Sequence, residues 1–177
     1  MPPASDLKAM GGFTLVELIV TMMLISVAVL GISYALSFAF SHQSDGLWQV
    51  KSIALAQSYI EEISARRFDE MTPVGGVPPC SASTTACTAP GPEGESRALF
   101  DDVDDYDGLN ESPPRDAQGS ARPGYEGYRV LISVEYMNAG QIGALNLDDA
   151  TDAKLVLVSV IPPGGSTMSF PVLRTNF

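Results

Sequence analysis

A run of acidic side chains in the middle of the chain has the composition of a cation site. Five aspartates fall within seven residues, at Asp101, Asp102, Asp104, Asp105 and Asp107. Carboxylate oxygens are ligands that Ca²⁺ prefers, and Gly108 would allow a sharp turn beside them. An EF-hand is excluded, because the register that places Gly108 at loop position six places Val103 at position one and Pro114 at position twelve. The alternative is a solvated loop in which some of these carboxylates cap turns or a helix N-terminus.

The two cysteines, Cys80 and Cys87, are the second group with distinctive chemistry. Six residues separate the thiols and no further Cys or His pair completes four ligands, which argues against a zinc site. The same spacing excludes a CxxC redox motif. In an oxidising compartment the two thiols are expected to form a disulfide. Closing so short a loop would stabilise the fold by roughly 2.5 kcal/mol on the chain-entropy description.

No arrangement of residues in the sequence predicts catalysis. The chain has one histidine, His42, and no glycine-rich phosphate loop followed by lysine. The cysteines are not free to act as nucleophiles if they pair with each other. We therefore expect no enzyme, no catalytic residue and no cofactor other than Ca²⁺ at the aspartate run.

Glu17 stands alone within a long apolar stretch. Residues 13–40 contain no other charged side chain and no proline. At about 1.5 Å rise per residue this stretch is long enough to cross a bilayer as a helix, which satisfies its own backbone polar groups in lipid. A carboxylate inside such a helix costs on the order of 2.5–3.5 kcal/mol. Proximity to the helix N-terminus would make its position tolerable, and a partner of opposite charge would make it useful.

The residues that surround Glu17 resemble a known processing signal. The segment Gly12-Phe13-Thr14-Leu15-Val16-Glu17 is similar to the N-terminal signal of type IV pilins and pseudopilins. The resemblance implies that a prepilin peptidase cuts after Gly12 and methylates the new amine of Phe13. It also implies that Glu17 pairs with the Phe13 amine of a neighbouring subunit when the helices assemble into a filament.

The resemblance also implies where in the cell the protein is located and which proteins it binds. Residues 1–12 would be the leader, and the precursor would cross the inner membrane once, with a periplasmic C-terminal domain that later joins an extracellular pilus. The partners would be the peptidase, an inner-membrane assembly platform and other pilin subunits. The leader departs from the usual basic pattern, since only Lys8 opposes Asp6. A signal peptide removed whole and a plain single-span anchor are the alternatives.

The charge balance argues against nucleic acid as a partner. The sequence has a formal net charge of −11. Between Glu70 and Glu126 there are eleven acidic residues and three arginines. Binding nucleic acid requires cations that replace phosphate counterions, and in this segment acidic residues far outnumber the arginines.

Residues 41–69 are predicted to continue the helix as an amphipathic half. Apolar residues recur at three- and four-residue spacing, at Val50, Ile53, Ala56, Ile60 and Ile63. This stripe requires a cover, and a helix that continues to Phe68 would provide a long surface for it. Asp45-Gly46 is the weak point, because glycine costs about 1 kcal/mol relative to alanine in a helix.

The remainder of the chain is predicted to be a loop region followed by a small antiparallel sheet. Residues 70–127 are acidic and rich in Pro, Gly, Ser and Thr, which indicates a variable loop region. Residues 128–136 alternate apolar and polar side chains, residues 154–161 are apolar on nearly both faces, and residues 166–175 carry Pro171, which indicates an edge strand. Together with the helix, residues 128–177 predict an α+β fold, the pilin layout, with three to four strands covering the helical stripe.

The aspartate run also resembles one group within that family. Its core, Phe100-Asp-Asp-Val-Asp-Asp-Tyr106, is similar to a segment of MshD-type minor pilins of the mannose-sensitive haemagglutinin (MSHA) pilus. This resemblance implies a minor pilin that serves surface attachment. A minor pseudopilin of a type II secretion system is the alternative within the family, and a membrane-tethered periplasmic binding domain is the alternative outside it.

Overall fold

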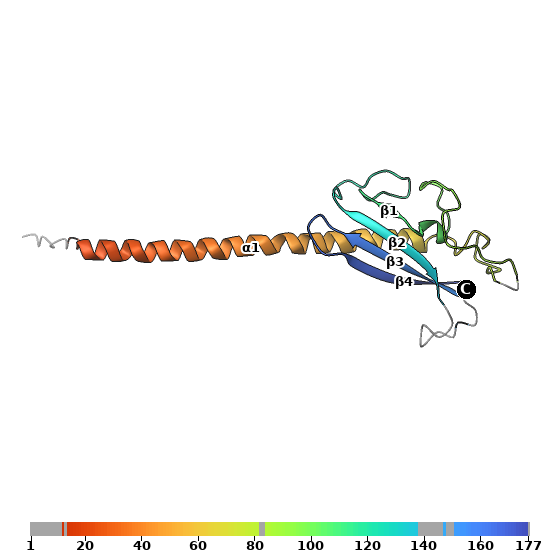
Figure 1. Ribbon diagram of the computed structural model, residues 1–177, viewed down its shortest axis with the longest axis horizontal. Coiled ribbons are helices and arrows are strands. Elements are labelled where there is room, and N and C mark those ends of the chain that lie inside the picture. Colours follow the sequence, from red (N-terminus) through yellow and green to blue (C-terminus); the bar gives the residue numbers. More distant parts are fainter. Residues whose placement is uncertain (1–11, 13, 82–83, 138–146, 148–150, 177) are drawn as a thin grey trace, which may run out of the picture. The chain divides into compact units, whose positions relative to one another are not determined.

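The chain forms one long helix followed by a four-stranded sheet (Figure 1). The computed structural model describes residues 12, 14–81, 84–137, 147 and 151–176. They fall into two compact units, residues 1–44 and 45–177, and each is described by itself. The elements in chain order are α1 (Leu15–Ser64), the 3₁₀ helix η1 (Asp104–Tyr106), β1 (Asn110–Glu111), β2 (Arg129–Tyr136), β3 (Ala153–Ile161) and β4 (Met168–Thr175). The α+β prediction is confirmed.

The sheet is antiparallel throughout and has the order β1-β2-β3-β4. Val130, Ile132 and Val134 of β2 face Val160, Val158 and Val156 of β3 in register, and all six are buried. Strand β3 is central, as its two apolar faces predict. Strand β4 is an edge strand, where Pro171 lacks an amide hydrogen without weakening the inner ladder.

The buried face of the sheet packs on the second half of α1. The core contributed by the helix consists of Leu55, Ala56, Tyr59 and Ile63, with Ser52 buried beside them. The predicted stripe is confirmed at Ala56 and Ile63, which are buried, and at Ile60, which packs partly buried against the core, whereas Val50 is 66% exposed and Ile53 is 37% exposed. The buried positions keep three- and four-residue spacing, but serine and tyrosine occupy two of them.

Trp48 extends this core at the turn between β3 and β4. Its ring is partly buried against the core cluster. A Cβ atom placed on Gly164 would lie 2.5 Å from the Trp48 ring, which explains why a residue without a side chain occupies this turn. Gly46 lies within the bounds of α1, so the glycine does not end the helix.

Helix α1 ends earlier than Phe68, the predicted end. After Ser64 the backbone turns to pair with the acidic segment: the Val103 N–H donates to the Arg67 carbonyl at 3.0 Å, and the Arg67 N–H donates to the Asp101 carbonyl at 3.3 Å. A helical conformation at Arg67 would lose both bonds. Residues 70–127 are also more ordered than a loop region implies, because they supply η1 and β1 to the sheet-bearing unit.

Candidate functional site

The N-terminal unit presents an apolar helical surface with no cover. Among the described residues, Leu15–Phe40 is the one helical stretch long and apolar enough to cross a membrane, with 26 residues and a mean hydropathy of 2.5. None of the window that meets this test is buried inside the protein. A fully exposed apolar helix is not stable in water, so its side chains require lipid or other helices around them.

Glu17 lies in the first turn of this helix. The Oγ1 of Thr14 accepts the Glu17 N–H at 3.3 Å, and the Thr14 carbonyl accepts the Leu18 N–H at 3.2 Å, so Thr14 acts as the N-cap. The carboxylate therefore sits at the positive end of the helix dipole. Gly12 is exposed just ahead of the helix. Phe13 lies outside the described residues, so its pairing with Glu17 and its methylation stay predictions.

The hydroxyl groups farther along this helix find their partners within it. Thr21 Oγ1 donates to the Leu18 carbonyl at 2.9 Å, and Ser26 Oγ donates to the Met22 carbonyl at 2.8 Å. Such bonds allow hydroxyls to enter an apolar environment at little cost. Glu17 is the one charged residue of the stretch, and its pairing with a group outside the helix stays a prediction.

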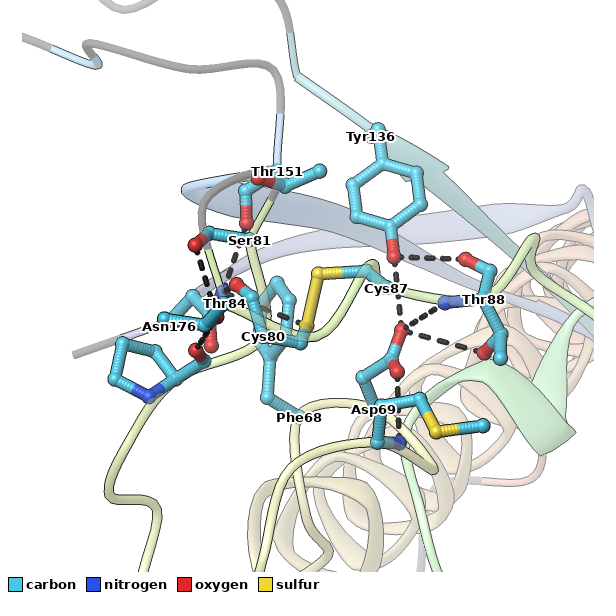
Figure 2. The surroundings of a disulfide bond; sticks show 12 residues. Phe68, Asp69, Cys80, Ser81, Thr84, Cys87, Thr88, Tyr136, Thr151 and Asn176 are labelled. Carbon is cyan, nitrogen blue, oxygen red and sulfur yellow. Dashed lines mark hydrogen bonds between the residues drawn. A yellow bond between two sulfur atoms is a disulfide. The ribbon is translucent and has the colours of Figure 1, made fainter.

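The predicted disulfide is confirmed. Cys80 and Cys87 are bonded, with their Cα atoms 5.1 Å apart. Figure 2 shows that Asn176, close to the C-terminal end, reaches this loop: its Nδ2 donates to the Cys80 carbonyl at 2.8 Å and to the Thr151 carbonyl at 3.1 Å. These hydrogen bonds therefore hold Asn176, which follows β4, against the disulfide loop.

The aspartate run is largely buried and caps its own turns. Asp102 Oδ1 accepts the N–H groups of Asp104 and Asp105 at 2.7 and 3.1 Å, while Asp105 Oδ2 accepts those of Asp101 and Asp102 at 2.8 and 3.1 Å. Asp107 Oδ1 accepts the Val134 N–H at 2.8 Å. The capping alternative is thus correct, but a solvated loop is wrong for Asp102, Asp104 and Asp105, which are at most 3% exposed.

The calcium site stays a prediction for Asp101, Asp102, Asp104, Asp105 and Asp107. Carboxylate oxygens of Glu70, Asp101 and Asp102 lie within 4.8 Å of one another. The guanidinium of Arg67, however, bonds both Glu70 and Asp101. A cation bound there would have to compete with an arginine that is already in place.

The sequence analysis missed a buried ionic cluster around Lys154. The Lys154 ammonium lies 2.6 Å from Asp104 Oδ2, 3.3 Å from Asp69 Oδ2 and 2.7 Å from the Phe68 carbonyl, and all three charged residues are 0% exposed. Asp69 Oδ2 also accepts hydrogen bonds from the Thr88 N–H and the Tyr136 hydroxyl (Figure 2). A signal was present: Lys154 shares the inward face of β3 with Val156, Val158 and Val160, where a charge needs a partner.

The two carboxylates of this cluster differ in their proton affinity. Burial raises the pKa of Asp104 to about 7, although Lys154 opposes the rise. Burial acts in the same direction on Asp69, but the Met71 N–H, the Lys154 charge and the Tyr136 hydroxyl outweigh it and hold the pKa below its usual value. Asp104 is therefore the acid of the pair and Asp69 the carboxylate.

A second buried network joins the helix to the acidic region. Glu62 of α1 accepts bonds from Arg97, Arg122 and the Tyr106 hydroxyl, and Arg97 also bonds Glu111 of β1 at 3.2 Å. The side chains of Glu62, Arg97 and Glu111 are 7–10% exposed. Arg97 lies over the rings of Phe100 and Tyr106. Sequence reasoning could not find this network, because its members come from three separate segments.

The buried, turn-capping position of Asp102 predicts how the stability of the fold depends on pH. Burial raises the pKa of Asp102 from 3.8 to about 6, so the fold favours the protonated form. The stabilisation that protonation gives is fully present below about pH 4 and is lost as the pH rises through about 6. Asp102→Asn keeps the Oδ1 acceptor but carries no charge. At pH 8 we expect the free energy of unfolding of the variant to exceed that of the wild type by on the order of 2 kcal/mol. At pH 3.5 we expect the two values to be equal.

Urea unfolding of the full chain in detergent, followed by the fluorescence of Trp48, measures this difference. Asp116→Asn is the matched control, because Asp116 Oδ1 also accepts two backbone N–H groups, from Gln118 and Ser120, but at an exposed turn. Equal pH dependence in all three proteins would contradict the assigned role of Asp102.

The comparisons with known proteins bear on the N-terminal unit. Residues 7–33 match the family described as the prokaryotic N-terminal methylation motif. This match covers less than half of the chain, and it includes Gly12, Glu17 and the first turns of α1. No curated protein and no solved structure gave a significant match. The chain therefore carries the prokaryotic N-terminal methylation motif over the start of an uncovered apolar helix, a combination that supports a type IV pilin or pseudopilin assignment.

Proposed function

We propose that this chain is a minor type IV pilin of the MSHA kind, which assembles through its N-terminal helix into a pilus for surface attachment. The observation that carries the proposal is the methylation motif joined to an exposed apolar helix with a single charged residue. Processing after Gly12 would place a free amine on Phe13, close in sequence to Glu17. The pilus assignment itself rests on the resemblance of Phe100–Tyr106 to MshD-type pilins.

The pairing of Glu17 with an amine explains why a carboxylate belongs in this helix. An ammonium and a carboxylate are each costly in an apolar environment, and together they form a strong charge-assisted hydrogen bond. Within one helix the carboxylate has no cation available, because residues 13–40 contain none. A neighbouring subunit supplies one, so that the pair fixes the register of one helix against the next.

The mass of the mature N-terminus tests the processing step. We expect the chain recovered from cells to begin at Phe13 with one added methyl group. Gly12→Val should leave the leader attached, because the peptidase requires a glycine before the cut, whereas Gly11→Ala should be processed normally. Recovery of the chain with Met1 still in place would support a plain anchor, and loss of the whole apolar stretch would support an ordinary signal peptide.

A minor pseudopilin of a type II secretion system remains the second candidate, because the same motif serves both filaments. Deletion of this chain in the native host separates the two. Loss of surface fibres and attachment with normal secretion is the expected result for a pilin. Normal fibres with retained secretion substrates in the periplasm would favour the pseudopilin.

A further inference from the structure

The buried cluster around Lys154 has the composition of a site that makes a covalent bond. We propose that the Lys154 amine and the Asp104 carboxyl group condense to an intramolecular amide, an isopeptide bond, with Asp69 as the group that moves the proton. The bond would join β3 to η1, two segments separated by 50 residues. This inference does not depend on the filament function.

The reacting atoms are held together and kept dry. Lys154 Nζ lies 2.6 Å from Asp104 Oδ2, and Asp69 Oδ2 lies 3.3 Å from the same nitrogen. The Phe68 ring centroid is 4.2 Å and the Tyr136 centroid 4.7 Å from Nζ. All three charged side chains are 0% exposed. Exclusion of water favours a condensation that releases water. Because the fold already holds the amine and the carboxyl group in contact, the reaction does not have to bring them together at a further cost in entropy.

The protonation states suit the same reaction. Amide formation needs a neutral carboxylic acid and a neutral amine. The pKa of Asp104 is raised to about 7 by burial, so a large share of this group is neutral near pH 7. Asp69 is the carboxylate, because the Met71 N–H and neighbouring groups lower its pKa against the effect of burial. Both carboxylates contact the same nitrogen, Lys154 Nζ, so Asp69 lies beside the reacting pair.

The atoms and charges balance without any further reagent. Asp69 accepts a proton from the Lys154 ammonium, and the neutral amine attacks the Asp104 carboxyl carbon. The new C–N bond forms, a C–O bond breaks, and one carboxyl oxygen leaves as water with two protons. The products are the amide, one water molecule and a protonated Asp69. Nothing is oxidised or reduced.

The product removes two unfavourable features of the ionic cluster. Asp104 Oδ1 is buried and has no hydrogen-bond partner among the described residues, so losing one carboxyl oxygen removes an unsatisfied polar atom. The amide is neutral, whereas the ionic form keeps three ionisable groups out of water. An ion pair that never reacts has the same starting geometry, and the mass of the chain separates the two.

Intact mass spectrometry of the full chain, purified from membranes and reduced, is the direct test. We expect a mass lower by one water molecule than that of the same processed sequence. After trypsin digestion, residues 98–115 and 130–174 should appear as one linked species, because an amide at Lys154 prevents cleavage there. Lys154→Arg keeps the charge but cannot form the bond, and should show the full mass. Asp69→Asn should also show the full mass, while Asp107→Asn, the matched control, should lose water.

The unmodified wild-type mass would overturn the proposal, as would loss of water that persists in Lys154→Arg. The wild-type measurement needs no variant to fold, so a misfolded variant cannot obscure it. The Glu17→Ala chain should lose water like the wild type, since this site lies in residues 45–177, a compact unit of its own.

Discussion

Glu17→Ala is expected to remain in the membrane at the wild-type level and to disappear from the filament fraction. The substitution shortens no part of the apolar stretch and removes its single charge, so insertion becomes easier. In the proposed filament, however, the amine of the neighbouring subunit would be left without its partner in an apolar environment. We expect incorporation to fall at least about tenfold, the equivalent of 1.4 kcal/mol or more per contact. Immunoblots of sheared surface fibres and of membranes measure both quantities.

Two further variants test whether the loss of incorporation depends on the Glu17 carboxylate. Glu17→Asp retains a carboxylate on a shorter side chain and should recover part of the incorporation. Thr21→Ala removes a polar group one turn farther along, but Thr21 bonds its own helix at Leu18, so filaments should form normally. If Glu17→Ala enters filaments as well as the wild type, or if no filament contains the chain at all, a tethered periplasmic domain becomes the better interpretation.

The sheet was predictable because its signals are local. The alternation in β2 indicates which of its residues turn inward, the two-sided apolar character of β3 indicates a central strand, and Pro171 marks the edge. The N-terminal helix was predictable for the same reason, since its length and composition leave one environment open to it. The disulfide followed from the two cysteines and the expected compartment.

The N-terminal part of the helical stripe was not predictable in this way. Val50 and Ile53 are apolar but exposed, while Ser52 and Tyr59 are buried. Val50 and Ile53 are more hydrophobic than the two residues that are buried. The inward face of the helix, however, also has to supply a hydroxyl group to Glu111, and Tyr59 supplies it. The burial of Tyr59 follows a hydrogen bond that only the partner segment, far away in the sequence, can reveal.

The same limit applies to the buried charges. Asp104 reads as one solvated acid among several until Lys154 is placed against it. Helical spacing places Arg66 four residues after Glu62 on α1, but the partners of Glu62 are Arg97 and Arg122. Helical spacing suggests local pairs that contribute a few tenths of a kcal/mol, whereas the distant pairs are buried, so removing one partner from them costs much more.

Arg97→Met is expected to destabilise residues 45–177 strongly. Methionine fills much of the space of the arginine stem, so the lost quantity is mainly charge. Glu62 would keep Arg122, but Glu111 would lose its cation while remaining 7% exposed. Removing one partner from a buried ionic network costs about 3–5 kcal/mol, because the other charges stay buried without compensation. Urea unfolding followed by Trp48 fluorescence measures the loss.

A compensating variant separates charge from packing. If the cost arises from uncompensated carboxylates, then Arg97→Met combined with Glu62→Gln and Glu111→Gln should recover most of the stability, since glutamine still accepts from Tyr106 and Tyr59. Arg129→Met is the matched control, because Arg129 is exposed on β2 and its replacement should change the free energy by no more than about 0.5 kcal/mol. A triple variant as unstable as Arg97→Met alone would show instead that Arg97 acts through its packing on Phe100 and Tyr106. The network would then hold the acidic region to α1 by aromatic contact, and the carboxylates would be secondary.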